Sequence, residues 1–298
     1  MKTGAKQLVK DATGAAKQIP HTAQTAGGFG MTVSETAPEE TYTRSFYQRL
    51  RGGATRSAEV IVPLVLQMIP VRSVVDVGCG DGSWLAVFRE LGVKEGLGID
   101  GDYVDRNLLQ IPQERFRAMD LTRAFALERV FDLAVSLEVA EHLPAESAAT
   151  FVECLTRLAP FVLFSAAIPS QGGQGHVNEQ WQDQWAALFR ERGYLAVDFL
   201  RRRVWSNDDV EWWYAQNTLL FARENQLQGN AALKAEFERT DPHQLRLVHP
   251  KLHLSRAALG PALPPVGARA AARLFLVCLV KAITRRVYSA IGRETPRQ

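Results

Sequence analysis

The chain has 298 residues, a net charge of +3 at pH 7, 46% hydrophobic and 22% charged residues, which is the composition of a soluble globular protein. This length fits one α/β domain with appendages or two small domains. The three cysteines lie far apart without a C-x-x-C pair, which suggests neither a disulfide framework nor a structural zinc site. We therefore predict no metal site and expect a reducing cytoplasm.

The N-terminal 40 residues contain lysines but no apolar stretch of signal-peptide length, and we predict a flexible segment there. Residues 41–70 combine aromatic and basic side chains with a helical pattern, which predicts a helical cap at the start of a domain that extends over residues 41–225. Residues 226–298 form the third predicted part, a basic helical C-terminal tail.

Apolar strand-like runs alternate with helical patterns from Ser73 onward. The predicted strands cover residues 73–77, 96–99, 116–119, 131–137, 161–166, 195–204 and 218–222, and the helices between them cover about 83–91, 145–158 and 179–192. This alternation predicts a Rossmann-like α/β fold, with a doubly wound, mostly parallel seven-stranded sheet and helices on both faces.

A glycine-rich turn follows the first predicted strand, in the pattern D-x-G-x-G-x-G that starts at Asp76. Gly78, Gly80 and Gly82 permit backbone conformations that other residues avoid, so a ligand can approach this turn closely. The spacing G-x-G-x-G departs from the dinucleotide fingerprint G-x-G-x-x-G, which argues against NAD. The free amides after the turn favour an anionic group and Asp76 favours an ammonium group, so the turn suggests an amino-acid head.

The first four predicted strands each end in, or beside, an acidic residue: Asp76, Asp100, Asp120 and Glu138. Ligands of open α/β sheets bind beyond the carboxyl ends of the strands, so these four side chains predict a crevice for a ligand rich in hydroxyl and amine groups. Each acid taken alone could simply cap a turn or a helix. The repetition at four strand ends favours a binding site.

The glycine turn resembles the first motif of class I S-adenosylmethionine (SAM)-dependent methyltransferases, and the run SLEVAEHLP at 136–144 resembles their fourth motif. These motifs occur in family order over residues 71–143. The resemblance implies SAM as cofactor, with Asp100 at the ribose hydroxyls and with Asp120 and the amide of Leu121 at the adenine amine. The cofactor-binding residues that it implies are Asp76, Gly78, Cys79, Gly80, Gly82, Asp100, Gly101, Asp120, Leu121, Leu137 and Glu138.

Two histidines are candidate catalytic residues. Methyl transfer from a sulfonium is an in-line displacement, so the protein mainly aligns donor and acceptor and excludes water. An alcohol acceptor must also lose a proton, and His142 and His176 are placed to accept it, because imidazole titrates near neutral pH. Each histidine could instead be structural, and a reaction without a protein base is a further alternative.

The run QGGQGHVNEQW at 171–181 and the run VEWWYAQN at 210–217 resemble bacterial methyltransferases associated with glycan or secondary-metabolite clusters. We therefore expect methyl transfer to a small-molecule or glycan acceptor, at oxygen. The alternatives are a catalytically silent SAM-binding or scaffold protein and, less favoured, a nucleotide-sugar or NAD-binding enzyme. Nucleic acid is not favoured as a partner, since basic residues gather in the tail and no N/D-P-P-Y/F run follows the fourth strand.

Trp205, Trp212, Trp213 and Tyr214 crowd one short stretch. Such aromatic side chains can stack on a sugar or ring acceptor, but they more often form the core, and we favour the core interpretation.

In the tail, an apolar stripe at helical spacing lies among basic residues. Its members are Leu276, Val280, Ile283 and Val287. This pattern predicts an amphipathic helix that packs on the domain or on a partner, with peripheral contact to an anionic membrane as the alternative. Its apolar run is far shorter than the roughly 20 residues that span a bilayer.

Overall fold

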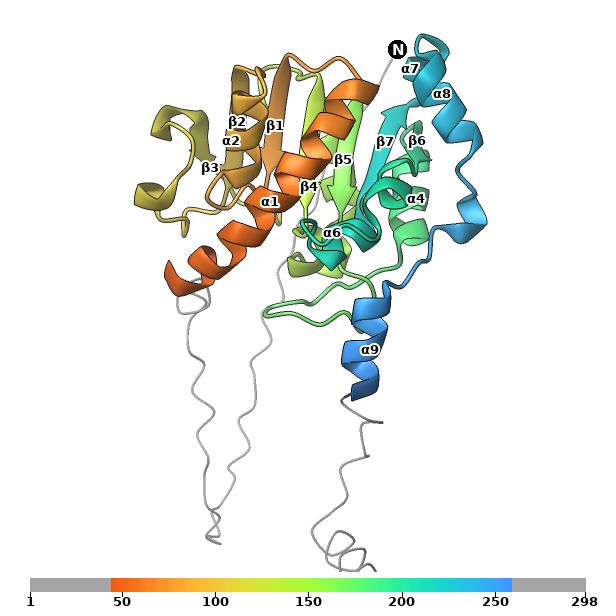
Figure 1. Ribbon diagram of the computed structural model, residues 1–298. Coiled ribbons are helices and arrows are strands. Elements are labelled where there is room, and N and C mark those ends of the chain that lie inside the picture. Colours follow the sequence, from red (N-terminus) through yellow and green to blue (C-terminus); the bar gives the residue numbers. More distant parts are fainter. Residues whose placement is uncertain (1–43, 259–298) are drawn as a thin grey trace, which may run out of the picture. The chain divides into compact units, whose positions relative to one another are not determined.

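A seven-stranded sheet forms the centre of the computed structural model, which describes residues 44–258, with side chains from residue 52 onward (Figure 1). The strands are β1 (Ser73–Val77), β2 (Glu95–Asp100), β3 (Phe116–Ala118), β4 (Leu133–Leu137), β5 (Phe161–Ser165), β6 (Tyr194–Val197) and β7 (Leu219–Arg223). Their order is β3-β2-β1-β4-β5-β7-β6, and β7 runs antiparallel to both of its neighbours while the first five strands are parallel. The predicted mostly parallel sheet is confirmed.

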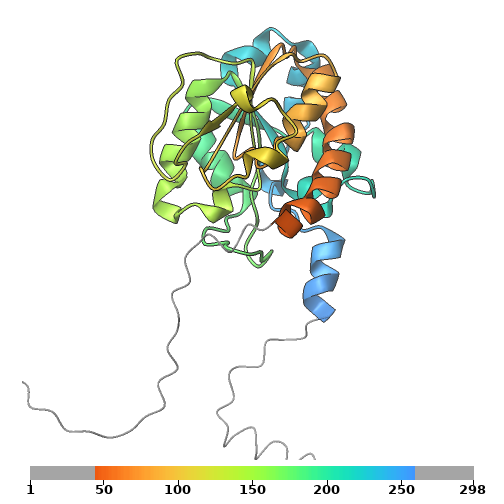
Figure 2. The same ribbon diagram turned by 90° about the vertical axis from the view of Figure 1, so that its left-hand side faces the viewer.

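Helices cover both faces of the sheet, with α1 and α2 on one side and α3 on the other (Figure 2). The helices are α1 (Arg44–Met68), α2 (Ser83–Glu90), α3 (Ala148–Leu158), α4 (Gln182–Arg190), α5 (Leu200–Val204), α6 (Trp212–Asn217), α7 (Glu224–Gln228), α8 (Ala231–Glu238) and α9 (Pro250–Ala258). Successive side chains of a strand point to opposite faces, so Val74 and Leu163 pack with α1 and α2, whereas Val75 and Val162 pack with α3 and α4.

The structure corrects one predicted strand. The sequence predicts a strand over residues 195–204, but β6 ends at Val197 and α5 begins at Leu200. The Asp198 carboxylate accepts hydrogen bonds from Nε and a terminal nitrogen of Arg201, at 2.9 and 2.6 Å. A helical turn brings residues three positions apart together in this way, whereas an extended strand keeps them apart.

Part of the predicted C-terminal tail contributes to the core. Leu227 and Leu233 are buried in the cluster that contains α1, and Leu245 is buried in the cluster that contains α3. The division of the chain into three parts at residues 40 and 225 stays a prediction. The predicted N-terminal segment, and the apolar stripe that begins at Leu276, lie outside the described residues. Within residues 44–258 the structure contains no helix with the length and apolarity that a membrane span needs.

Candidate active site

A cavity of about 430 Å³ lies at the carboxyl ends of β1, β2 and β4. It has the size of ordinary small-molecule sites and the position expected for ligands of open α/β sheets. Nine of the residues proposed from the sequence line it: Asp76, Gly78, Cys79, Gly80, Asp100, Leu137, Glu138, His142 and His176. The fold therefore brings together side chains that lie up to 100 positions apart in the sequence.

The turn after β1 needs glycine for two reasons. Gly78, Gly80 and Gly82 have φ values of 82°, 54° and 80°, which side chains disfavour. A Cβ atom on Gly78 would also lie 2.3 Å from the Val139 side chain. The amide of Gly80 donates a 2.7 Å hydrogen bond to the Asp100 carboxylate, so the turn is fixed to the end of β2.

Buried carboxyl groups dominate the charge of the cavity. Asp76 is 3% exposed, and no hydrogen bond reaches its carboxyl group from the described residues. Burial raises the pKa of Asp76 to about 8, and the nearby Asp100 and Asp81 add to the rise. The lining residues in the described range include five carboxyl groups and no lysine or arginine. Such a cavity favours a cationic ligand.

Asp100 is held in one orientation at the end of β2. One oxygen accepts the Gly80 amide, and the other accepts the Gly101 amide at 2.6 Å and the Tyr103 hydroxyl at 2.7 Å. Burial raises its pKa, although these three donors favour the ionised form and counteract the rise. A carboxylate that already accepts a hydroxyl is suited to the hydroxyls of a ligand.

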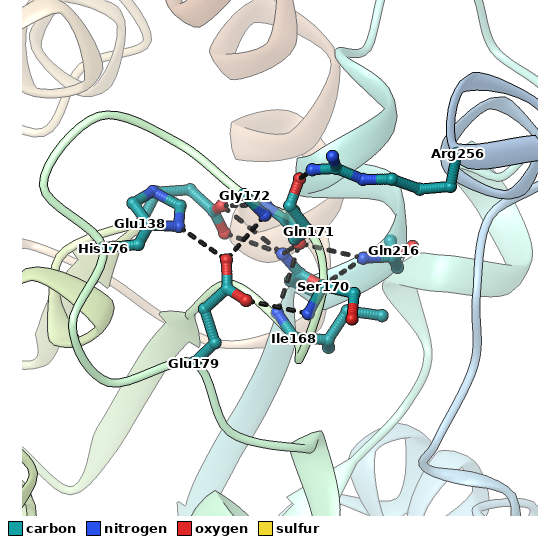
Figure 3. Close-up of polar contacts among 10 residues, drawn as sticks. Glu138, Ile168, Ser170, Gln171, Gly172, His176, Glu179, Gln216 and Arg256 are labelled. Carbon is teal, nitrogen blue, oxygen red and sulfur yellow. Dashed lines mark hydrogen bonds and ion pairs between the residues drawn. The ribbon is translucent and has the colours of Figure 1, made fainter. Parts of the chain in front are cut away.

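Glu138 anchors a polar network that sequence reasoning missed (Figure 3). Its carboxylate accepts hydrogen bonds from the side-chain amides of Gln171, at 3.0 Å, and Asn217, at 3.1 Å. The Gln216 side chain donates in turn to the Gln171 side chain at 3.1 Å. The network joins the end of β4, the loop before α4 and the end of α6. The only sequence signal was that these amides lie in the two runs 171–181 and 210–217.

The loop at 170–179 carries His176 to the cavity and is fixed on two sides. Glu179 accepts the amides of Ser170, at 2.8 Å, and Gly172, at 2.6 Å, and it contacts His176 Nδ1 at 3.0 Å (Figure 3). The amides of Val177 and Asn178 donate to the Glu141 carbonyl. These bonds hold His176 against the short 3₁₀ helix Ala140–His142.

The two candidate histidines lie next to each other, with ring centroids 4.8 Å apart and the rings perpendicular. Burial lowers the pKa of His142 to about 4, and the nearby His176 adds to this effect, so the His142 ring is neutral at pH 7. Glu141 is fully buried beside them. One ligand atom from each of Glu141, His142 and His176 lies within 4.8 Å of the others, so these residues could hold a metal ion.

Aromatic side chains form a further wall. The core interpretation is incomplete here, because Trp212, Trp213 and Tyr214 line the cavity, together with Trp84. The rings of Trp84 and Tyr214 meet edge to face, with centroids 5.2 Å apart, and Tyr214 is also part of the apolar core. Trp205 contacts the His249 ring at a second, smaller hollow instead.

Four residues proposed for cofactor binding do not line the cavity: Gly82, Gly101, Asp120 and Leu121. Asp120 is exposed, and its carboxylate accepts the amide and hydroxyl of Thr122 at 3.0 and 2.6 Å. Leu121 is buried in the core cluster that contains α3. The acid that follows β3 therefore begins a turn, and its contact with the adenine amine stays a prediction.

A family model described as a methyltransferase domain matches residues 44–219, more than half of the chain. No curated protein shows significant sequence similarity to the chain.

Solved structures of similar fold include a sugar N-methyltransferase from Streptoalloteichus, with 16% identity, a TM-score of 0.49, and coverage of 67% of this chain and 99% of that chain. An amino pentose methyltransferase from Micromonospora echinaspora, solved with SAM, has 15% identity, a TM-score of 0.43, and coverage of 61% and 98%. Magnesium protoporphyrin IX methyltransferase from Synechocystis, solved with SAH, has 17% identity, a TM-score of 0.42, and coverage of 61% and 89%. Because the family model covers more than half of the chain, with six of the seven strands, the glycine turn and the cavity wall, the chain belongs to the SAM-dependent methyltransferases, and SAM is its cofactor.

Proposed function

We propose that the chain transfers the methyl group of SAM to a hydroxyl of a small molecule or glycan. The observation that supports oxygen as the acceptor atom is the pair of adjacent imidazole rings in the wall of the carboxylate-rich cavity. A hydroxyl must lose its proton in the reaction, and a neutral imidazole can accept that proton.

The cavity fits SAM by charge. SAM supplies a methyl group on a sulfonium centre and carries an ammonium group. It therefore brings positive charge to five carboxyl groups, and the described residues of the cavity wall include no lysine or arginine. Asp76 would hold the ammonium group, and Asp100 would hold the ribose hydroxyls. The glycine turn lets the backbone approach the cofactor, and Cys79, Leu137 and Glu138 are the other predicted cofactor-binding residues that line the cavity.

His176 is the better placed of the two candidate bases. When its Nδ1 carries the hydrogen and donates to Glu179, the Nε2 atom is left as a proton acceptor. Glu179 would also stabilise the imidazolium that forms. The low pKa of His142 makes its imidazole a weaker base, which suits a positioning role. The aromatic wall of Trp84, Trp212 and Tyr214 would exclude water from the acceptor.

The cytoplasmic location, the membrane contact of the basic tail and the exclusion of nucleic acid as a partner stay predictions.

Replacing His176 with alanine should reduce methyl transfer by about a hundredfold or more, with less than a twofold change in SAM affinity, because His176 would act on the acceptor. The measurement is methyl release with a panel of sugar and phenolic hydroxyl acceptors, with calorimetry for SAM. His253→Ala is the control, since His253 is exposed on α9. Unchanged turnover in His176→Ala would remove this residue from the mechanism.

If the unaltered protein binds SAM but releases no methyl group to any acceptor of the panel, the catalytically silent alternative gains support and the hydroxyl acceptor loses it.

A further inference from the structure

We propose that Glu141, His142 and His176 bind one divalent transition-metal ion in the wall of the SAM cavity. The ion would bind oxygen atoms of the acceptor. The acceptor class would be a molecule that offers the ion two neighbouring oxygens, such as a vicinal diol. The binding site stands on geometry alone, and its catalytic role rests on the proposed function.

The first observation is the spacing of the ligand atoms. One nitrogen from each histidine and one carboxylate oxygen lie within 4.8 Å of one another. Metal–ligand distances of about 2.1 Å place two ligands of one ion at most about 4.2 Å apart. Small rotations of these side chains therefore suffice to bring all three atoms onto one ion.

The second observation is a buried carboxyl group that has no hydrogen bond of normal geometry, although the Ala167 amide and the Glu138 carboxyl group lie near it. Glu141 is 0% exposed, and neither of its oxygens accepts a hydrogen bond of normal geometry. His142 Nδ1 is likewise buried without a hydrogen bond of normal geometry, with the Gly175 backbone beside it. Unpaired buried polar atoms are costly, and a charged one is costlier, so native proteins pair them or coordinate them to metals. Since neither lysine nor arginine is among the described lining residues, a bound cation is the missing partner.

The surroundings of the three residues support an ion site. Glu179 contacts His176 Nδ1 at 3.0 Å, and this arrangement of carboxylate and imidazole is typical of metal ligands, where it leaves Nε2 for the ion. The Glu141 carbonyl accepts the amides of Val177 and Asn178, so the loop that carries His176 is fixed to the 3₁₀ helix that carries the other two ligands.

The ligand set selects the kind of ion. Two imidazole nitrogens and one carboxylate suit Zn²⁺, Mn²⁺, Co²⁺ or Fe²⁺, whereas Mg²⁺ and Ca²⁺ prefer sets made of oxygen. Three protein ligands leave coordination positions open, and the cavity provides access to them.

The role of the ion would be to acidify the acceptor. A hydroxyl bound to the ion loses its proton to water more easily, and the resulting alkoxide forms the C–O bond as the C–S bond of the sulfonium breaks. The products are a methyl ether, neutral S-adenosylhomocysteine and one proton. With the ion bound, the two histidines act as ligands of the ion, which activates the acceptor hydroxyl, and they do not act as bases.

The test uses the full chain, stripped with a chelator and titrated with Co²⁺ while its visible absorption is recorded. We expect one Co²⁺ per chain, with affinity lower by on the order of a hundredfold in Glu141→Gln and in His176→Asn. The matched controls are Glu146→Gln and His253→Asn, whose side chains are exposed, and they should bind Co²⁺ as the unaltered chain does. A SAM affinity near that of the unaltered chain shows that a variant is folded. If Glu141→Gln does not fold, His176→Asn, whose substitution lies on a loop, provides the test.

No stoichiometric binding by the unaltered chain, or equal binding by a folded site variant, would overturn the proposal. Because Co²⁺ binding is measured without methyl transfer, its failure leaves the hydroxyl acceptor and the base role of His176 open to their own test. Stoichiometric binding without methyl release would instead count against the proposed function alone.

Discussion

Replacing Asp76 with asparagine should weaken SAM binding by about a hundredfold or more and, at the same time, stabilise the ligand-free protein. The two effects have one cause. The Asp76 carboxyl is buried, receives no hydrogen bond from the described residues and lies near two other carboxyl groups. Ionising this carboxyl group is unfavourable until a cation binds beside it. The side chain therefore favours ligand binding and destabilises the ligand-free fold. Removing one partner of a buried charge pair costs about 2–5 kcal/mol of binding free energy.

The pH dependence follows from the pKa of Asp76, which is raised from 3.8 to about 8. Between these values the folded chain holds a proton that the unfolded chain has lost. The free energy of unfolding should therefore fall as the pH rises from about 4 to 8 and level off above that. Asparagine has no proton to lose, so the stability gain of Asp76→Asn should grow with pH, by on the order of 5 kcal/mol between pH 4 and pH 8.

SAM affinity should change with pH in the opposite direction. The ammonium group prefers the ionised carboxylate, so affinity should rise toward pH 8, by up to about tenfold per unit, and this slope should be absent in Asp76→Asn. Calorimetry and thermal unfolding from pH 6 to pH 9 measure both effects. Asp102→Asn is the control, because Asp102 is exposed and bonded to Arg106. Equal SAM affinity in Asp76→Asn and the unaltered chain would remove Asp76 from the binding site.

Replacing Asp198 with asparagine should cost about 3–5 kcal/mol of stability, the largest loss that we expect from a single polar substitution. Arg201 is 1% exposed, and Asp198 neutralises it through two hydrogen bonds of 2.9 and 2.6 Å. Arg201 also donates to the carbonyl of Leu245 at 2.8 Å, which ties the segment after α8 to the sheet domain. Without Asp198 the guanidinium stays buried and lacks its counter-charge.

Thermal unfolding measures this loss, which corresponds to a decrease of about 10 °C in the midpoint for a domain of this size. The control is Asp208→Asn, which removes a 2.9 Å ion pair with Lys251 whose side chains are 91% and 53% exposed. Such a surface pair contributes less than about 1 kcal/mol, so the two variants differ in burial rather than in chemistry. A similar small decrease in both would show that the Arg201 pair contributes no more than a surface one.

The sheet and half of the cavity could be predicted because their signals are local. A β-branched run predicts β1, and alternating glycines predict the turn after it. The acids near the carboxyl ends of β1 and β2 reach the cavity because parallel strands end at the same edge. Asp120 shows the limit of this rule. A serine or threonine two residues later can donate a hydrogen bond to the carboxylate and form a turn with it, as Thr122 does.

The other half of the cavity depends on contacts between distant segments. Asn217 meets Glu138 across 79 positions, and nothing in either local run predicts that pairing. The isolation of the Glu141 carboxylate is likewise a property of its surroundings rather than of the run SLEVAEHLP. Trp212 and Trp213 have the same aromatic character as core residues, and only their place on α6 exposes them to the cavity.

A crystal structure of the full chain with S-adenosylhomocysteine would test the binding of the cofactor most directly. We expect the amino group of the ligand within about 3 Å of the Asp76 carboxylate, the ribose hydroxyls at Asp100, and the sulfur facing the wall that carries His142 and His176. A ligand bound elsewhere, or bound here with Asp76 and Asp100 turned away from it, would contradict the account.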